Sequence, residues 1–234
     1  MKRASKIITR VILSCCILAM GMLLFGFNGG NKVENPFASE TPIVSTFSKS
    51  VNAPFQSGDL IFQSSTAGQG QAIQLATHSK YSHVGILFER EGQLVVYEAV
   101  QPVKITPLHD FIHRDKNGAY VVKRLKNAKE VLTPEVLQKM KAIGKRFLGK
   151  NYDLYFEWSD ERIYCSELVW KMYKEATGLE IGKLQPLSDF DLTHPAVKEK
   201  IRERYGQNIP LDEWMISPGA MFDSEELYTV KVQL

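Results

Sequence analysis

A cysteine, a histidine and a glutamate stand where they could together form a catalytic group. Cys165 lies at the start of a predicted helix, whereas His83 and Glu98 lie on predicted apolar strands upstream. A thiol can act as a nucleophile when an imidazole serves as its base and a carboxylate orients that imidazole. These residues therefore indicate an enzyme that reacts through a thioester, but they do not identify its substrate.

The start of a helix suits a reactive cysteine. The partial positive charge at a helix N-terminus favours the thiolate, and the unpaired N–H groups there can bind an oxyanion. The other cysteines, Cys15 and Cys16, lie inside an apolar run near the N-terminus, so Cys165 has no disulfide partner within the predicted domain. The alternative interpretation is that Cys165 is a small buried hydrophobic residue, as free cysteines commonly are.

His83 and Glu98 fall on the two strands of a predicted hairpin, residues 82–88 and 93–100. His83 shares a strand face with Gly85, where the missing side chain leaves room for a ligand or another segment. The position of the turn predicts that His83 and Glu98 are nearly opposite, with Cβ atoms about 5 Å apart. The alternatives are a core histidine bonded to a backbone carbonyl and an exposed glutamate at a strand end.

The pattern of elements predicts an α+β fold, in which the cysteine-bearing helix packs on an antiparallel sheet. Thr133 and Pro134 are typical of a helix N-cap and first turn, and Gly149 and Gly178 follow predicted helix ends. The predicted strands are residues 59–62, 82–88, 93–100, 103–106, 120–125 and 227–232, and the predicted helices are residues 71–78, 133–148, 164–177 and 195–205.

An apolar run from Val11 to Phe27 follows a basic cluster, which is typical of a secretory leader or a membrane anchor. No Ala-x-Ala pattern follows, which favours an uncleaved anchor, and a cleaved signal peptide stays open. We expect residues 1–30 to form this segment, residues 31–56 a polar linker, and residues 57–234 a domain outside the cytoplasm, membrane-anchored or secreted. The net charge of +3 is partly due to the basic flank, so it does not indicate nucleic-acid binding.

Four stretches resemble one known family. They are residues 58–62 (GDLIF), 82–86 (SHVGI), 96–99 (VYEA) and 164–169 (YCSELV), of which the last is the most specific. The chain is similar to the YiiX-type circularly permuted papain-like hydrolases, which are relatives of the NlpC-type cell-wall peptidases and of lecithin retinol acyltransferase. The resemblance covers the chain from about Gly58 to the C-terminal strand.

The resemblance implies a papain-like sheet against a cysteine-bearing helix, with Cys165 as nucleophile, His83 as base and Glu98 orienting the imidazole. It also implies residues that border the substrate pocket: Tyr152, Trp158, Arg162 and Tyr164.

The predicted function is that of an extracytoplasmic cysteine hydrolase that cleaves amide bonds, in cell-wall peptides or related amides of the cell envelope. Because the nucleophile, the base and the oxyanion donors are all protein groups, we expect no cofactor and no metal. Lipid acyl ester hydrolysis or acyl transfer on the same fold is one alternative, and a non-catalytic, membrane-tethered binding module is another. The oligomeric state is not predicted.

Two other motifs could carry chemistry. His109 and His113 have the spacing of two metal ligands on one helix, but Asp110 is one carbon shorter than the glutamate of zinc peptidases and no third ligand is evident. A surface turn is therefore the favoured interpretation. Residues 68–70 (GQG) lack the rest of a phosphate-binding loop, and we interpret them as a flexible lead into the next helix.

Overall fold

The structure, a computed structural model, describes residues 55–65, 68–114 and 118–233. The predicted leader and most of the predicted linker lie outside the described residues. Within this part of the chain, no helix has the length and apolar character needed to cross a membrane. Phe55 and Gln56, which we assigned to the linker, contact the domain: the ring of Phe55 lies 6.2 Å from that of Tyr120, and the backbone N–H of Gln56 donates to Asp59.

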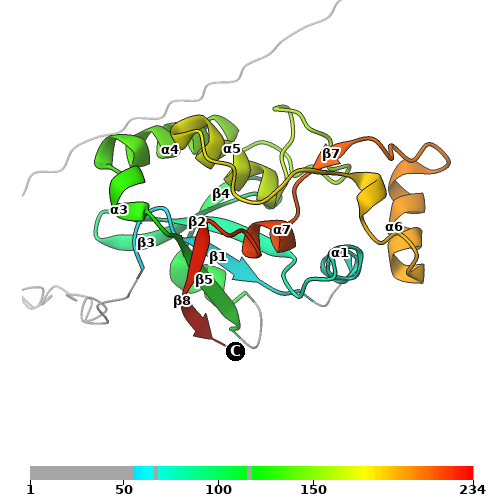
Figure 1. Cartoon of the computed structure of the whole chain (residues 1–234), viewed down its shortest axis with the longest axis horizontal. Coiled ribbons are helices and arrows are strands. Elements are labelled where there is room, and N and C mark those ends of the chain that lie inside the picture. Colours follow the sequence, from blue (N-terminus) through cyan, green and yellow to red (C-terminus); the bar gives the residue numbers. More distant parts are fainter. Residues whose placement is uncertain (1–54, 66–67, 115–117, 234) are drawn as a thin grey trace, which may run out of the picture. The chain divides into compact units, whose positions relative to one another are not determined.

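A six-stranded antiparallel sheet organises the domain, with its strands in the order β4-β3-β2-β1-β5-β8 (Figure 1). Each strand corresponds to one predicted from the sequence, and together with the helices they confirm the predicted α+β class. The strands are β1 (Leu60–Gln63), β2 (His83–Arg90), β3 (Gln93–Glu98), β4 (Lys104–Pro107), β5 (Tyr120–Leu125) and β8 (Leu227–Gln233).

Helices α4 (Pro134–Phe147) and α5 (Cys165–Thr177) pack against each other on one side of the sheet (Figure 1). The side chain of Thr133 accepts the N–H of Val136 and caps α4, as its residue type predicted. Gly178 ends α5 in the left-handed conformation with φ 81°. Apolar side chains of the sheet and of both helices form the main core, among them Leu60, Ile86, Tyr97, Met140, Leu168 and Met172.

A smaller core covers the opposite face of the sheet. Phe111 from α2 (Leu108–Ile112) is fully buried there and packs with Leu87 and Val96. His109 and Asp110 lie at the surface, as we expected for this segment, but it forms a short helix and not a turn, because burial of Phe111 holds it against the sheet.

Further short elements complete the domain, and two of the helices match the predicted segments. Helix α1 (Gln69–Thr77) begins earlier than predicted, and α6 (Pro195–Tyr205) lies beside it. The elements that the sequence pattern did not predict are α3 (Ala128–Val131), β6 (Gln185–Pro186), η2 (Leu187–Asp189), β7 (Trp214–Met215) and α7 (Pro218–Phe222).

Candidate active site

Cys165 is the first residue of α5 and is almost completely buried, with 2% of its surface exposed. Tyr164 precedes it at the N-cap, and the carboxylate of Glu167 accepts the backbone N–H of Tyr164 at 3.4 Å. This contact is part of a capping arrangement that fixes where the helix begins. The thiol therefore lies at the positive end of α5, as predicted from the sequence.

His83 is the first residue of β2, and its Nε2 lies 2.7 Å from Oε2 of Glu98. This contact leaves Nδ1 as the ring nitrogen available to the thiol, and the His83 side chain shares a hydrogen bond with Cys165. The ring of Phe111 stacks on the imidazole with its centroid 5.7 Å away. A thiol, an imidazole and a carboxylate from three separate elements thus meet at one place.

The hairpin register differs from the prediction. Ile86 pairs with Tyr97, so Gly85 and not His83 stands opposite Glu98. His83 and Glu98 are diagonal neighbours, and their side chains are long enough to bridge the offset. Gly85 is required because a Cβ atom there would lie 2.4 Å from the side chain of Val96. The space that we expected beside Gly85 is filled by the neighbouring strand.

Glu98 is fully buried, and each of its oxygens accepts two hydrogen bonds. Oε1 accepts from the hydroxyl of Thr106 at 2.6 Å and from Nη2 of Arg114. Oε2 accepts from Nη1 of Arg114 at 2.9 Å and from His83. Burial acts to raise the pKa of Glu98, but the bonds from His83 and Arg114 outweigh it and lower this pKa to about 2. The carboxylate is therefore ionised at neutral pH.

The surroundings of His83 and Cys165 favour an ion pair between them. Burial acts to lower the pKa of His83, but hydrogen bonds with Cys165 and Glu98 raise it to about 9. Burial acts to raise the pKa of Cys165, whereas the bond with His83 and donors from the backbone of Val84 and Ser166 lower it below its ordinary value. At neutral pH these shifts favour the thiolate and the imidazolium.

Tyr152 and Gln69 lie beside the sulfur. The hydroxyl of Tyr152 shares a hydrogen bond with Cys165, and Nε2 of Gln69 donates to that hydroxyl at 3.2 Å. Burial, and then the charge on Cys165, raise the pKa of Tyr152 well above its ordinary value, so its hydroxyl keeps its proton. The Tyr152 hydroxyl and the first N–H groups of α5 are thus donors next to the position where an oxyanion would form.

An apolar pocket and a polar groove meet at these residues. The apolar pocket, about 710 Å³ including the solvent at its opening, is bordered by α1, α6, the segment before α6 and the segment after β7, with Tyr164 and Cys165 in its wall. The polar groove, about 1480 Å³, is bordered by His83, Arg114 and Tyr152. Gln69 borders both spaces. A substrate could therefore occupy the pocket and the groove at once, with its reacting bond between Cys165 and His83.

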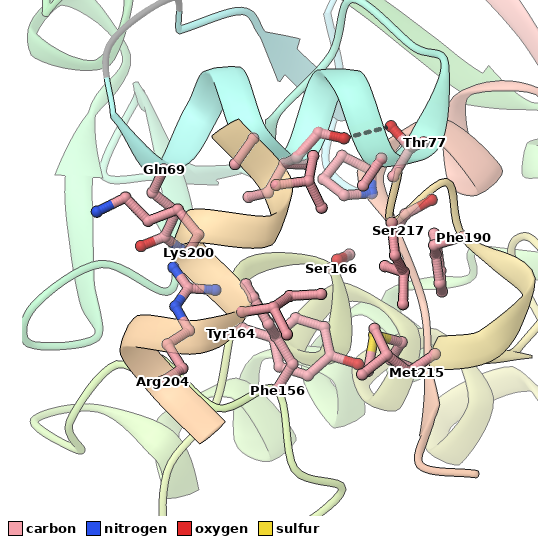
Figure 2. A pocket seen from close by; sticks show the side chains of 18 of the residues that line it. Gln69, Thr77, Phe156, Tyr164, Ser166, Phe190, Lys200, Arg204, Met215 and Ser217 are labelled. Carbon is pink, nitrogen blue, oxygen red and sulfur yellow. Dashed lines mark hydrogen bonds between the residues drawn. The ribbon is translucent and has the colours of Figure 1, made fainter. Parts of the chain in front are cut away.

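The apolar pocket has a basic rim. Figure 2 shows Lys200 and Arg204 extending from α6 toward Gln69 on one side of the pocket. The guanidinium of Arg204 lies 5.0 Å from the ring centre of Phe156, and Nζ of Lys200 pairs with Glu203 at 2.6 Å. Most of the remaining lining is apolar and includes Ile73, Leu187, Phe190, Leu192, Ile201 and Met215.

The structure divides the four residues that the resemblance placed around the substrate pocket. Tyr152 borders the groove and Tyr164 borders the pocket, whereas Trp158 and Arg162 line neither. The ring of Trp158 packs edge-on against Trp170 at 5.2 Å, and Arg162 pairs with a neighbouring glutamate at 2.5 Å. Trp158 therefore packs against α5, and Arg162 is held within its own loop.

Sequence reasoning missed Thr106, Arg114, Gln69 and the contribution of α6. Thr106 lies on a predicted strand. Lys104 pairs with Glu98, and Thr106 is two residues after Lys104, so alternation along β4 places Thr106 on the same face of the sheet as Glu98. Arg114 has no comparable signal, because only the folding of α2 against the sheet brings it to Glu98.

The paired histidines of α2 are close to each other. The rings of His109 and His113 stack with centroids 4.2 Å apart, and Nδ1 of His113 donates to the carbonyl oxygen of His109 at 2.8 Å. Among residues 55–65, 68–114 and 118–233, no group of three or more histidine, cysteine, aspartate or glutamate side chains is arranged to hold a metal ion. We therefore assign no metal to this pair.

Known proteins are similar to this chain in sequence and in fold. Residues 54–231 match a family described as permuted papain-like amidase enzymes, YaeF/YiiX, the C92 family. The uncharacterized protein YiiX of Escherichia coli strain K12 is 51% identical over 175 residues, which are 75% of this chain and 85% of that protein. The crystal structure of a protein described as metalloprotein YiiX, from Escherichia coli O157:H7, has 51% identity and a TM-score of 0.72, and covers 76% of this chain and 97% of its own. These matches confirm the predicted family and its permuted papain-like fold.

Proposed function

We propose that this chain, which belongs to the family of permuted papain-like amidases, is a cysteine hydrolase whose catalytic residues are Cys165, His83 and Glu98. The observation that carries this proposal is the position of His83 between the buried carboxylate of Glu98, at 2.7 Å, and the thiol at the start of α5. The predicted activity is cleavage of an amide bond through an acyl-thioester.

In the first half of the reaction, the thiolate of Cys165 attacks the carbonyl carbon of the amide. The carbon–sulfur bond forms, and the carbonyl electron pair moves to the oxygen, where Tyr152 and the N–H groups of α5 stabilise the negative charge. The imidazolium of His83 then donates its proton to the amide nitrogen, the carbon–nitrogen bond breaks, and the amine leaves. The acyl group stays on the sulfur as a thioester.

In the second half, a water molecule attacks the thioester while His83 takes up one of its protons. The carbon–sulfur bond breaks, the carboxylic acid product leaves, and the thiolate and imidazolium are restored. Glu98 takes no proton in this cycle. It accepts from Nε2 of His83, so that Nδ1 stays directed at the sulfur and the amine.

The two substrate spaces suggest which half of the substrate goes where. The acyl group is attached to Cys165, whose thiol borders the apolar pocket, and the amine leaves beside His83, which borders the polar groove. We therefore place the acyl part in the pocket and the amine in the groove. The apolar lining favours a second candidate function, hydrolysis or transfer of a lipid acyl group, in which an alcohol replaces the amine.

The proposed location is the extracytoplasmic face of the membrane, with a substrate of the cell envelope. Its support is the apolar run from Val11 to Phe27 and the basic residues before it, which lie outside the described part of the structure. A reporter enzyme that is active only after export, fused after Leu234, tests the location. An inactive reporter together with a soluble cytosolic fusion contradicts it.

The test of the reaction is to trap the acyl-enzyme. The full chain is incubated with a cell-envelope extract, with a short peptide amide and with a long-chain acyl amide, then acid-quenched and analysed by mass spectrometry. We expect an acyl adduct on Cys165 whose mass identifies the acyl group and which hydroxylamine, a reagent that cleaves thioesters, removes. We expect no such adduct on the Cys165→Ser variant. No adduct and no turnover with any of these substrates, or adducts on Cys15 and Cys16 alone, would contradict the proposal.

A further inference from the structure

We infer that Arg114 is a positioning residue of this active site, which holds Glu98 in place and through it orients His83. This inference rests on the proposed function, because it assigns Arg114 a part in the same reaction. It adds a fourth residue to the three that the sequence indicated. The role that we infer for Arg114 is its contact with Glu98, so this effect on the reaction passes through the imidazole, although the Arg114 side chain also borders the polar groove.

The contact between Arg114 and Glu98 is bidentate. Nη1 donates to Oε2 at 2.9 Å, and Nη2 donates to Oε1. A planar guanidinium that binds both oxygens of a carboxylate fixes the plane of that carboxylate as well as its position. Because Oε2 also accepts from His83, fixing the plane of Glu98 fixes the direction in which the imidazole must point.

Burial makes the charge of Arg114 necessary. The Glu98 side chain is 0% exposed, whereas the side chain of Arg114 is 38% exposed on the polar groove. A buried carboxylate without a cationic partner is unstable and tends to take up a proton. A protonated Glu98 could no longer serve as a charged acceptor for His83. Arg114 therefore keeps Glu98 ionised without itself requiring burial.

Among the groups that face Glu98, Arg114 is the one that can keep its carboxylate ionised throughout the reaction. From β2, His83 is cationic only while the thiolate–imidazolium pair exists, so it cannot hold the carboxylate throughout the cycle. From β4, Thr106 donates a neutral hydrogen bond, and Lys104 pairs with Glu98 through the strand register but has an exposed side chain. Arg114 is thus the cation that remains on Glu98 when His83 gives up its proton.

Phe111 connects Arg114 to the imidazole a second time. The guanidinium carbon lies 5.1 Å from the centre of the Phe111 ring, and the imidazole of His83 stacks on the same ring. Phe111 is fully buried, and its carbonyl oxygen accepts from Gln63 at 3.0 Å, which ties the end of α2 to the sheet. The position of α2 therefore sets the positions of Arg114 and of the ring beneath His83 together.

The experiment measures alkylation of Cys165 by iodoacetamide as a function of pH, in the full chain. Iodoacetamide is small and neutral, so its reaction reports the thiolate and does not depend on binding in the groove. The variants are Arg114→Gln, Arg114→Lys and, as a matched loss of one surface charge, Arg90→Gln, whose side chain is 63% exposed. Turnover of the amide whose acyl group labels Cys165 gives kcat and KM for each variant.

For Arg114→Gln we expect the acid limb of the alkylation profile to move to higher pH by about one to two units, the shift that corresponds to losing a hydrogen bond to a charged group. We expect kcat to fall roughly 10- to 100-fold for the same reason, while KM changes little. Arg114→Lys keeps the positive charge but cannot bind both carboxylate oxygens, so its acid limb should lie between those of the unmodified chain and Arg114→Gln. The acid limb of Arg90→Gln should match that of the unmodified chain.

An acid limb in Arg114→Gln that coincides with that of Arg90→Gln overturns the inference, whether or not the variant is less stable. A rise in KM with an unchanged acid limb also overturns it and assigns Arg114 to substrate binding. If Arg114→Gln does not fold, an Arg114→Lys variant equal to the unmodified chain in both acid limb and kcat overturns it. Failure of the proposed function looks different, because Cys165 of the unmodified chain would then alkylate no faster than a small thiol.

Discussion

Replacing Glu98 with glutamine tests the role of the buried carboxylate while preserving the shape of the side chain. In the structure the carboxylate accepts four hydrogen bonds: one from His83, one from Thr106 and two from Arg114. An amide has one acceptor oxygen and brings two N–H donors. At least one of these partners must then face an N–H group, so the variant cannot satisfy His83 and Arg114 together.

The expected loss follows from the charge that is removed. A hydrogen bond to a charged group contributes about 1.5–3 kcal/mol, so losing the bond from His83 should lower kcat roughly 10- to 100-fold. KM should change little, because Glu98 is 0% exposed and cannot contact the substrate. The pKa of His83 should also fall from about 9, because Glu98 is one of the groups that raise it. The alkaline limb of activity should therefore move to lower pH.

The assay is turnover of the acyl amide that labels Cys165, measured across pH, with circular dichroism as the control for folding. Thr106→Val is the matched variant, since it removes one neutral donor from Glu98 and leaves the charge. We expect it to lose less activity than Glu98→Gln and to keep the alkaline limb. A folded Glu98→Gln enzyme with full kcat and an unmoved alkaline limb would refute the reasoning and remove Glu98 from the site.

Three further outcomes are expected. Gly85→Ala should lower the free energy of unfolding by about 1–3 kcal/mol in urea titrations, because the new Cβ would meet Val96 at 2.4 Å; unchanged stability would show that the strands separate easily. Stability should decline as pH falls from 4.5 towards 2, since the pKa of Glu98 is lowered by folding; a Glu98→Gln variant that shows the same acid decline contradicts this. Phe190→Ala should lower kcat/KM for a long-chain acyl amide roughly tenfold and leave iodoacetamide labelling unchanged. An equal loss of kcat/KM for long-chain and short-chain substrates would contradict our placement of the acyl group in the pocket.

Local signals predicted the strands and the two long helices well. Thr133, Pro134 and Gly178 mark ends of α4 and α5 through backbone rules that act within a few residues, and apolar periodicity supplied the rest. Elements that depend on tertiary packing were missed or misjudged. The helix α2 exists because Phe111 is buried under the sheet, which no property of that segment alone indicates.

The register error has a specific physical cause. The hairpin turns through Glu91 and Gly92, both with positive φ, and Arg90 pairs with Gln93. This is a two-residue turn of the kind that suits the twist of paired strands. The predicted hairpin strands, residues 82–88 and 93–100, centre the turn one residue nearer the N-terminus, so that His83 and not Gly85 was expected opposite Glu98.

The three residues proposed to be catalytic could be selected from the sequence because each carries a local signal. Cys165 begins a helix, and His83 and Glu98 are polar residues on apolar strands. Arg114 could not, since its role depends on a contact made only in the folded chain. Trp158 was assigned to the substrate pocket by resemblance alone, and the structure packs it against Trp170 instead.

The most direct test of the central claim is the rate constant for alkylation of Cys165 at neutral pH, read by peptide mapping so that Cys15 and Cys16 are counted separately. We expect Cys165 to react about tenfold faster than a small thiol of ordinary pKa, and we expect His83→Ala to remove this advantage while the protein stays folded. A Cys165 that reacts no faster than the small thiol, or equally fast without His83, would contradict the account.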